Sequence, residues 1–565
     1  MTLPSPARRR LTPVVGAAVL AATTATAGLV TAPAQARPAD RPVPPQQELQ
    51  LVEATIDELQ KALVTGRTTC TEVVEGYLER IEAYDDQYLS YIELSDTALA
   101  EAAALDAQKA TRGATTPPLF CVPVVLKDNI DVEGLPTTAG SPVLAGMLPP
   151  DDAFVTEQLT DAGAIVLGKA NLDEFAFGFG GASALGGQVS NVYDLTRGPG
   201  GSSSGTGAAV AASLAMVGLG TDTGGSVRVP SSVEGLVGIR PTMRLVSQDG
   251  IIPLALFQDT AGPMCRAVED CALTLQVMAG FDDADSSGQY TLPQQRDDRG
   301  VLLGSEAAYA EVVGVRPDAY TKALKPQGLR NARVGVVRAL FGNDPEVIAT
   351  MEEAIAAMEA AGATVEDVTV PDLGVVTSFT SNSRFEFKDH LTRYLSDRPV
   401  DGYPRTFDEV RALTPSRQST FASYDVFGTD RYANPDYDLN TLERPGYVRP
   451  RLEAALDNTT LDGTALGEPY DALLYPSVVS LPRVGGSPSS GSNNRLSPYS
   501  GFPALSMPAG FTEATATRPA LPVGMELLGR EFDEPTLLRL AYGYQEAVEG
   551  TDLARQAPTT APELP

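Results

Sequence analysis

Hydrophobic positions recur at helical spacing in the first part of the chain. After Leu51, the residues Ile56, Leu59 and Leu63 follow one another at steps of three and four. A second amphipathic segment runs from Thr71 to Ala83, and an Ala-rich third segment comes after it. This spacing is typical of helices that bury one face. We therefore expect helices before the first strand.

The pattern then changes to short apolar runs separated by helical segments. The runs Val122–Leu126, Ala164–Leu167 and Met216–Leu219 have the length and composition of buried strands. The segments Val155–Ala162 and Gly207–Leu214 between them have helical composition. Such alternation predicts an α/β fold, in which a mixed β-sheet core is covered on both sides by α-helices.

The C-terminal half repeats this alternation. We expect strands at Val334–Val337, Thr364–Val370, Ala472–Tyr475, Ala504–Pro508 and Val523–Leu528, and helices at Pro345–Ala361 and Pro535–Val548. Residues 378–451, between these elements, are rich in Tyr, Arg, Asp and Phe and show no strand rhythm. They are either an insertion over a functional site or a surface decoration.

The N-terminus resembles an export signal. Three arginines, Arg8–Arg10, precede an apolar run from Val14 to Val30, and Ala34-Gln35-Ala36 forms an A-x-A cleavage pattern. We expect residues 1–36 to be a signal peptide and the protein to be secreted, by either the Sec or the twin-arginine route. A membrane anchor fits less well, because the run is Ala/Thr-rich and ends in a cleavage pattern.

Composition divides the remaining chain. Residues 37–45 and 557–565 have the composition of a disordered linker and tail, and no Gly/Ser or Pro linker interrupts the middle. We therefore expect a single domain over residues 46–556.

The formal net charge of −30 disfavours nucleic acid and anionic membranes as partners. This leaves a small-molecule or peptide substrate.

Histidine and cysteine usage limits the chemistry. The single histidine, His390, excludes a metal site built on several histidines, and the four cysteines show no C-x-x-C spacing. We expect neither a metal nor a cofactor. Export would permit disulfides; Cys265 and Cys271 are close enough to pair, which would leave Cys70 with Cys121.

Two glycine- and serine-rich clusters carry the strongest signal. Gly200–Gly207 and Gly220–Arg228 bracket an Ala-rich helix and a short strand. Glycine permits backbone conformations with positive φ, so Thr223-Gly224-Gly225-Ser226 can curl into a nest whose N–H groups converge. Such a nest is suited to stabilise an oxyanion next to a serine.

A lysine ends one of the predicted strands. Lys127 follows the apolar run Pro123–Leu126 and precedes Asp128-Asn129. Lysine is almost never fully buried without a specific role. In isolation it could equally extend its amine outward to solvent from the end of the strand.

These motifs together resemble the amidase signature family. The resemblance rests on Pro123–Asn129, Gly168–Asn171, the two Gly/Ser clusters, Gly238–Thr242, Gly501–Leu505 and Pro522–Met525. It implies that Lys127, Ser202 and Ser226 form the catalytic group and that Thr223, Gly224, Gly225 and Ser226 form the oxyanion hole. Ser203, Asp222 and Arg228, in the same motifs, are expected to support them.

The lysine must be neutral to act as a base. A free lysine is neutral at pH 7 in roughly one molecule in 2,500, a penalty of about 4.6 kcal/mol, and burial can remove most of it. Ser226 would then attack the carbonyl, with Ser202 and Lys127 relaying its proton. Glu386–Lys388 with Leu391 and Tyr394-Leu395, and the run Asn493–Pro498, resemble peptide-amidase-like members. This resemblance suggests peptide or amino-acid amides as substrates, among them peptide C-terminal amides, and the amidotransferase branch is disfavoured for an exported acidic protein.

Three alternatives stay open. Gly201–Gly205 also fits the G-x-S-x-G elbow of α/β-hydrolases, with Ser203 as nucleophile and His390 as base, although His390 looks like a residue on an exposed turn of helix. An esterase or aryl acylamidase would use the same site. The third alternative is a catalytically silent binding protein, which would have the same fold without enzymatic activity.

Overall fold

The computed structural model describes residues 49–112, 116–285, 306, 309–310, 319–414, 417–425, 435–486, 491 and 493–564. The predicted signal peptide, residues 1–36, and the linker 37–45 lie outside these residues. Contacts group Gln47–Pro565 into one compact unit. None of the described helices is long and apolar enough to cross a membrane.

An eleven-stranded mixed sheet forms the core, in the order β1-β3-β2-β6-β8-β7-β12-β13-β11-β9-β10. The strands are β1 Tyr91–Leu94, β2 Pro123–Lys127, β3 Ile165–Ala170, β6 Val217–Asp222, β7 Val237–Arg240, β8 Thr260–Cys265, β9 Arg333–Val336, β10 Thr364–Asp367, β11 Ala472–Pro476, β12 Ala504–Phe511 and β13 Pro522–Leu528. A small hairpin, β4 Ala182–Ser183 and β5 Gly187–Gln188, lies outside it.

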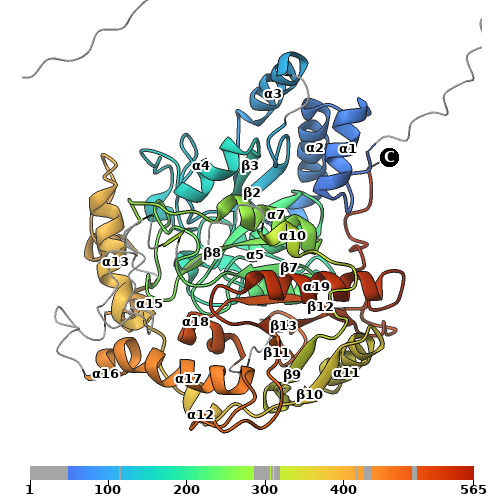
Figure 1. Ribbon diagram of the computed structural model, residues 1–565. Coiled ribbons are helices and arrows are strands. Elements are labelled where there is room, and N and C mark those ends of the chain that lie inside the picture. Colours follow the sequence, from blue (N-terminus) through green and yellow to red (C-terminus); the bar gives the residue numbers. More distant parts are fainter. Residues whose placement is uncertain are drawn as a thin grey trace, which may run out of the picture. The chain divides into compact units, whose positions relative to one another are not determined.

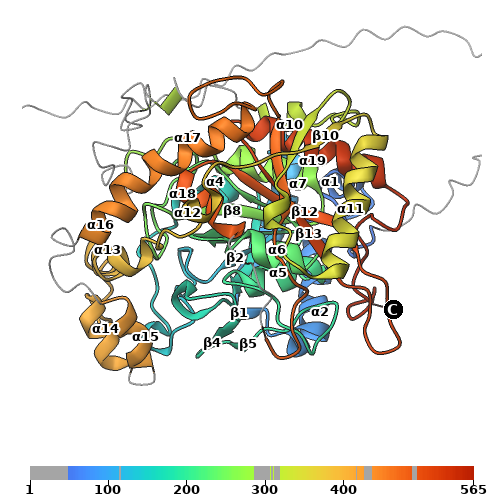
Figure 2. The same ribbon diagram turned by 90° about the horizontal axis from the view of Figure 1, so that it is seen from below.

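Helices cover both faces of the sheet, which confirms the predicted fold class. Helices α7, α10 and α19 lie over one face, and α5 and α6 lie over the other (Figures 1 and 2). The helices before residue 400 are α1 Ile56–Thr65, α2 Cys70–Tyr88, α3 Ala98–Arg112, α4 Phe154–Asp161, α5 Ser204–Ala211, α6 Arg228–Val233, α7 Val268–Met278, α10 Ala319–Ala323, α11 Pro345–Ala360, α12 Leu373–Val376 and α13 Ser383–Asp397. Those after it are α14 Phe407–Leu413, α15 Gln418–Ser423, α16 Pro435–Asp438, α17 Arg444–Leu456, α18 Leu496–Ser500 and α19 Glu534–Val548.

The strands nearest the predicted site are parallel and buried. β2 pairs in parallel with β3 on one side and β6 on the other. Every residue of the three strands is buried. Parallel strands covered on both faces read as continuous apolar runs, which explains why the sequence pattern located them. The same burial isolates any polar side chain at their carboxyl ends from water.

Residues 378–451 contain helices α13 to α16 and part of α17, and no strand in the stretches that the structure describes. Helix α13 packs an aromatic cluster against the segment before β4, with Phe387 and Phe177 4.8 Å apart between ring centroids. Tyr394 donates a hydrogen bond of 2.7 Å to Asp131 Oδ1. The region is therefore attached to the sheet domain by buried contacts.

The C-terminal segment is ordered where the composition suggested a disordered tail. Arg80, buried on α2, donates hydrogen bonds to the carbonyls of Ala561 at 3.0 Å and Pro562 at 2.8 Å. Tyr88 donates to Thr560 Oγ1 at 2.7 Å. Composition does not reveal these contacts, because two backbone carbonyls and the Thr560 hydroxyl of the segment bond to partners far away in the sequence.

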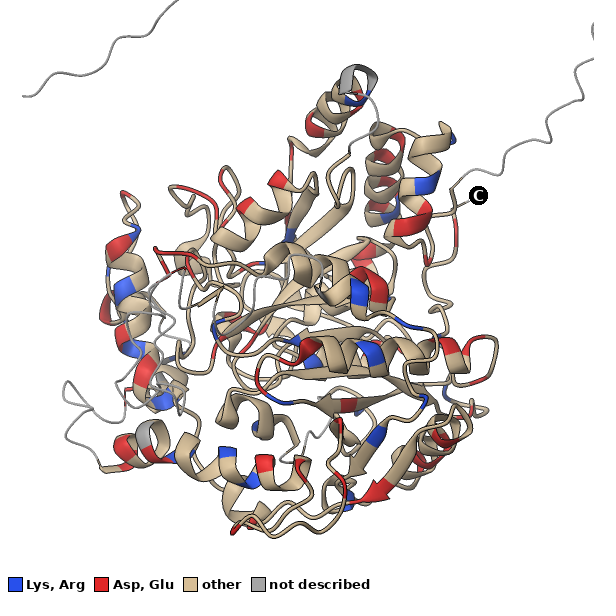
Figure 3. Ribbon diagram, in the orientation of Figure 1, with Lys and Arg blue, Asp and Glu red and all other residues tan. Residues whose placement is uncertain are grey.

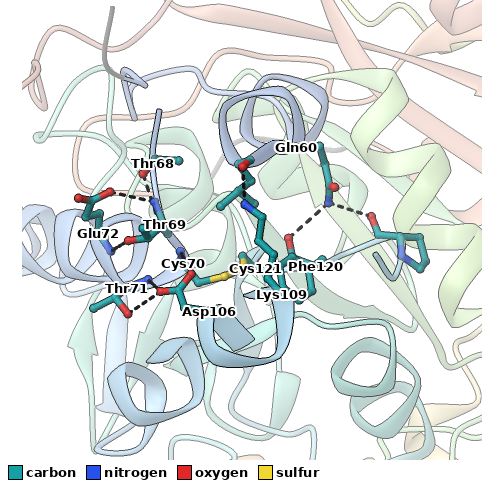
Figure 4. Close-up of a disulfide and its surroundings, with 12 residues drawn as sticks. Gln60, Thr68, Thr69, Cys70, Thr71, Glu72, Asp106, Lys109, Phe120 and Cys121 are labelled. Atoms are coloured by element: carbon teal, nitrogen blue, oxygen red, sulfur yellow. Dashed lines mark hydrogen bonds between the residues drawn. A yellow bond between two sulfur atoms is a disulfide. The ribbon is translucent and has the colours of Figure 1, made fainter. Parts of the chain in front are cut away.

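Two disulfides link neighbouring elements. Cys70 pairs with Cys121, with Cα atoms 5.2 Å apart, and Cys265 pairs with Cys271 at 5.6 Å. The first joins the start of α2 to the residues before β2 (Figure 4). Asp106 of α3 reinforces this junction by accepting a hydrogen bond of 2.8 Å from the Cys70 N–H (Figure 4).

Candidate active site

Lys127 lies at the buried end of β2. Its Nζ is 2.7 Å from Ser202 Oγ and 2.8 Å from Thr221 Oγ1. Burial lowers the pKa of Lys127 to about 7, against the opposing effect of the carboxylates of Asp173, Asp222 and Asp259. Near neutral pH a large fraction of this amine is therefore uncharged.

Thr221, next to this lysine on β6, was not predicted from the sequence. Its hydroxyl accepts hydrogen bonds from Lys127 Nζ and from Asn129 Nδ2, the latter at 3.2 Å. Its carbonyl lies 3.4 Å from the same Nζ. The pairing of β2 with β6 could have indicated Thr221, because parallel neighbours bring their carboxyl ends to the same edge of the sheet. Thr221 therefore fixes the position of the amine.

Ser202 is buried in the loop that leads into α5. The Asp173 N–H donates to the Ser202 carbonyl at 3.1 Å, and the Gly201–Ser202 peptide is cis. A Cβ at Gly201 would lie 2.0 Å from Asp173 Oδ2 and 3.0 Å from the Phe179 Cα. Glycine is required there because the chain passes so close to these neighbours.

The segment Thr223–Ser226 forms the turn between β6 and α6. Gly225 has φ +123° there, and a Cβ on it would lie 2.8 Å from the Asn494 Cβ. From outside the turn, Asn494 Nδ2 donates to the Gly224 carbonyl, and Gln258 Nε2 donates to the Thr223 carbonyl at 2.9 Å. These bonds fix the orientation of successive peptide groups in the turn.

One of the predicted oxyanion donors has an acceptor within the turn itself. The Gly225 N–H donates to Asp222 Oδ1 at 2.6 Å. Thr223, Gly224 and Ser226 line the adjacent cavity, whereas Gly225 does not. Within the described part of the chain, no group accepts a hydrogen bond from the N–H of Gly224 or Ser226. The N–H groups of Gly224 and Ser226 are therefore available to a ligand in the cavity, and the four-residue oxyanion hole stays a prediction.

A buried ion network lies behind the turn. Asp222 pairs with Arg228 at 3.0 Å and with Arg240 at 3.3 Å. Burial raises the pKa of Asp222, but the two guanidinium groups outweigh this effect and hold it well below its usual range. Arg228 also contacts Glu526 Oε1 at 2.5 Å, which in turn accepts from Tyr475 at 2.9 Å. Asp222 therefore stays ionised while it holds the N–H groups of the turn.

A cavity of about 400 Å³ opens beside Ser226. The residues that line it come from the turn and its surroundings, from residues 378–384 with Tyr424, and from residues 494–499. They are Ala176, Gly178, Phe179, Thr223, Gly224, Ser226, Leu254, Gln258, Ser378, Phe379, Thr380, Ser381, Arg384, Tyr424, Asn494, Arg495, Pro498 and Tyr499. This volume falls within the usual range for small-molecule sites.

Ser203 and His390 are not arranged as a nucleophile and its base. Ser203 Oγ lies 3.3 Å from the N–H and 3.4 Å from the carbonyl of Thr221. His390 is buried on α13, which corrects the expectation of an exposed residue. Its Nδ1 accepts from the Leu256 N–H at 3.2 Å and lies 3.8 Å from Glu386. Its side chain packs between α13 and the loop before β8.

Among the described residues, no group of three or more His, Cys, Asp or Glu side chains could hold a metal ion.

The family model described as Amidase matches residues 72–538, most of the chain. The chain belongs to the amidase signature family. It is therefore an amidase, an enzyme that hydrolyses the C–N bond of carboxylic amides.

Sequence relatives of this amidase include two proteins named as glutamyl-tRNA(Gln) amidotransferase subunits. The one from Moorella thermoacetica is 34% identical, over 89% of this chain and 98% of its own. The one from Myxococcus xanthus is 36% identical, over 88% and 98%.

Among solved structures, the amidase resembles native peptide amidase from Stenotrophomonas maltophilia. The TM-score is 0.75 with 32% identity, over 90% of this chain and 99% of that one. A peptide amidase bound to the competitive inhibitor chymostatin matches with the same TM-score and 33% identity. The core of the amidase, including the strands that carry its site, therefore has the family's architecture.

Proposed function

We propose that the protein is an exported hydrolase that cleaves carboxylic amides through an acyl-enzyme on Ser226. Ser202 and neutral Lys127 relay the protons. The observation that carries this proposal is the 2.7 Å contact between Lys127 Nζ and Ser202 Oγ in a fully buried setting. A pKa of about 7 for Lys127 supports its action as a base near neutral pH.

The first half of the reaction forms the acyl-enzyme. Lys127 accepts the Ser202 proton while Ser202 accepts that of Ser226, and Ser226 Oγ attacks the amide carbonyl. The N–H groups at the cavity stabilise the negative oxygen of the tetrahedral intermediate. Ser202 then gives a proton to the departing amine or ammonia, and the C–N bond breaks. A water molecule enters by the same relay, displaces Ser226 and frees the acid.

Peptide C-terminal amides are the proposed substrates, with ammonia as the leaving group. The likeness to peptide amidase over nearly the whole chain supports this class, as does a cavity with room for more than a simple amide. The amidotransferase relatives support a second candidate, in which ammonia passes to a partner protein. Ammonia release from peptide amides by the purified chain alone separates the two, because the second candidate needs its partner.

Export is proposed from residues 1–36 alone. Two disulfides in the structure are consistent with an oxidising compartment. N-terminal sequencing of protein recovered from the medium should begin near Arg37. Retention of the full-length chain inside the cell would contradict this part of the proposal and leave the chemistry untouched.

Variants test the mechanism. Lys127→Ala, Ser202→Ala and Ser226→Ala should each lower kcat by at least about 10³-fold on a peptide amide. His390→Ala serves as the matched control and should keep activity, although losing a buried side chain lowers stability. Loss of activity in His390→Ala with retention in Lys127→Ala would support the elbow mechanism.

Labelling distinguishes an enzyme from a silent binding protein. A fluorophosphonate probe should label the wild type and fail to label Ser226→Ala. An esterase or aryl acylamidase would also be labelled, so a panel of matched amides and esters decides the preferred bond.

A further inference from the structure

Arg384 differs from the other cations of its helix. On α13 and at its C-terminal cap, Lys388, Arg393 and Arg398 pair with Asp425, Asp397 and Asp131 respectively. Figure 3 shows Lys/Arg and Asp/Glu interspersed along this helix. Within the part of the chain that the structure describes, Arg384 forms no ion pair and no hydrogen bond. It lines the catalytic cavity instead.

The position of Arg384 is unfavourable for the helix itself. Arg384 is the second residue of α13, where the backbone N–H groups give the helix end a partial positive charge. A cation there is repelled by the helix dipole, whereas an anion would be stabilised. Within the described part of the chain, no carboxylate pairs with this guanidinium. An external anion would supply the missing partner.

The other charged residue that lines the cavity is also a cation. Arg495 also lines it, and its guanidinium donates to the Thr377 carbonyl, a neutral acceptor. No Asp or Glu is among the described residues that line the cavity, although the chain as a whole has a net charge of −30. The described lining of the cavity therefore carries two cationic side chains and no anionic one.

Aromatic rings make up much of the remaining wall. Phe179, Phe379, Tyr424 and Tyr499 line the cavity together with Leu254 and Pro498. Tyr499 is held from behind by Arg444, whose guanidinium carbon lies 4.3 Å from the ring centroid. Aromatic walls favour an apolar or aromatic body on the ligand.

We propose that the cavity selects amides whose acyl part carries both an apolar or aromatic body and a carboxylate, with Arg384 as the residue that binds the carboxylate. This inference rests on the proposed function, because it places the acyl part in the cavity beside Ser226. Arginine suits the task, since its planar guanidinium can bind both oxygens of a carboxylate. Arg495 adds a second positive charge to the lining of the cavity.

Binding can be measured without turnover. In the Ser226→Ala chain, titration calorimetry would compare N-succinyl-phenylalanine amide with N-acetyl-phenylalanine amide, which differ by a carboxylate. The anionic ligand should bind about tenfold more tightly, as expected for a charge-assisted hydrogen-bonded pair. Adding Arg384→Gln should remove this preference, and Arg384→Lys should restore part of it.

Arg393→Gln is the matched control. It removes one positive charge from the same helix, but this arginine pairs with Asp397 outside the cavity. The control should keep the tenfold preference, whereas rising salt should reduce the preference in the parent chain. Equal binding of the two ligands to the parent chain, or an equal loss of preference in Arg384→Gln and Arg393→Gln, would overturn the proposal.

Turnover separates this inference from the proposed function. In the otherwise unmodified chain, the ratio of kcat/KM for the succinyl amide to that for the acetyl amide should fall about tenfold in Arg384→Gln, mainly through KM. If neither amide is hydrolysed, the proposed function fails for this substrate class, while the calorimetric result still decides the role of Arg384. If both are hydrolysed with a ratio that Arg384→Gln does not change, the function stands and the inference fails.

Discussion

Thr221 contacts the Lys127 amine with two oxygen atoms, its hydroxyl at 2.8 Å and its carbonyl at 3.4 Å. A neutral amine has two N–H groups and one lone pair. If Thr221 accepts from both N–H groups, the lone pair is left for the hydroxyl of Ser202. The threonine therefore aligns the amine as an acceptor, which a base requires.

Replacing Thr221 by Val should lower kcat about tenfold with a smaller change in KM, because the isosteric side chain removes one acceptor and leaves the fold packed. Thr221→Ser is the control and should keep most of the activity, since it retains the hydroxyl. Steady-state kinetics on one peptide amide would measure both. Equal activity of the Val and Ser variants would show that the hydroxyl does not position the lysine.

The pH profile should report the buried lysine. Because the pKa of Lys127 is lowered to about 7 and the base must be neutral, kcat/KM should rise with pH and level off above an apparent pKa of about 7. An ordinary exposed lysine would place this limb near pH 10. A limb that far into the alkaline range would contradict the role of burial.

Stability should depend on pH through the same group. The unfolded chain binds the lysine proton more tightly than the folded chain between about pH 7 and 10.5, so the free energy of unfolding of the wild type rises across this window. Lys127→Met removes the effect, and its stability relative to wild type should fall as the pH rises from 7 to 10. Urea unfolding at several pH values would measure it. Lys61→Met, at an exposed lysine, is the control and should show no such trend.

Replacing the Asp222 carboxylate by an amide should lower kcat far more than the same change at Glu526. Asp222 accepts from the N–H groups of Gly225 and Val227 and pairs with two arginines. Asp222→Asn replaces an acceptor oxygen by a donor at this crowded point, so kcat should fall by about 10²-fold. Glu526→Gln keeps an oxygen that can accept from Arg228 and Tyr475, and should cost less than about fivefold. Similar losses in both variants would mean that the network does not act through the turn.

The two disulfides should contribute unequally to stability. They close loops of 51 and 6 residues in sequence separation, for which chain entropy predicts about 4 and about 2 kcal/mol. Cys70→Ala with Cys121→Ala should therefore lower the free energy of unfolding more than Cys265→Ala with Cys271→Ala. Urea titrations of the oxidised proteins would compare them, and the reverse order would contradict the loop-entropy account.

Part of the site was predictable because its residues lie in dense local motifs. Lys127 and Ser202 were identified from their clusters, and the structure brings them within 2.7 Å. Thr221 was missed because its role depends on the pairing of two strands, which no local pattern reveals. The use of the Gly225 N–H by Asp222 was missed for the same reason, since the sequence shows a glycine but not the direction of its N–H.

The fold was predictable where burial gives a continuous apolar run. The predicted strand Val122–Leu126 became β2 and Ala472–Tyr475 became β11, each within a residue at either end. β8 was missed because its sequence, Thr-Ala-Gly-Pro-Met-Cys, has a single β-branched residue and contains glycine and proline, which are depleted in strands. The burial of His390 was missed because its neighbours Lys388 and Asp389 are charged, while its own side of α13 faces the protein.

β12 pairs with β7 on one side and β13 on the other, and so joins the part of the sheet made from residues before 266 to the part made from residues after 332. During synthesis, the edge of β7 that pairs with β12 has no native partner until the chain has been made as far as Phe511. Until then, the backbone N–H and C=O groups along this edge of β7 are unpaired, and such an edge can pair with a wrong strand. The sheet of this amidase can therefore be completed only after most of the chain has been synthesised.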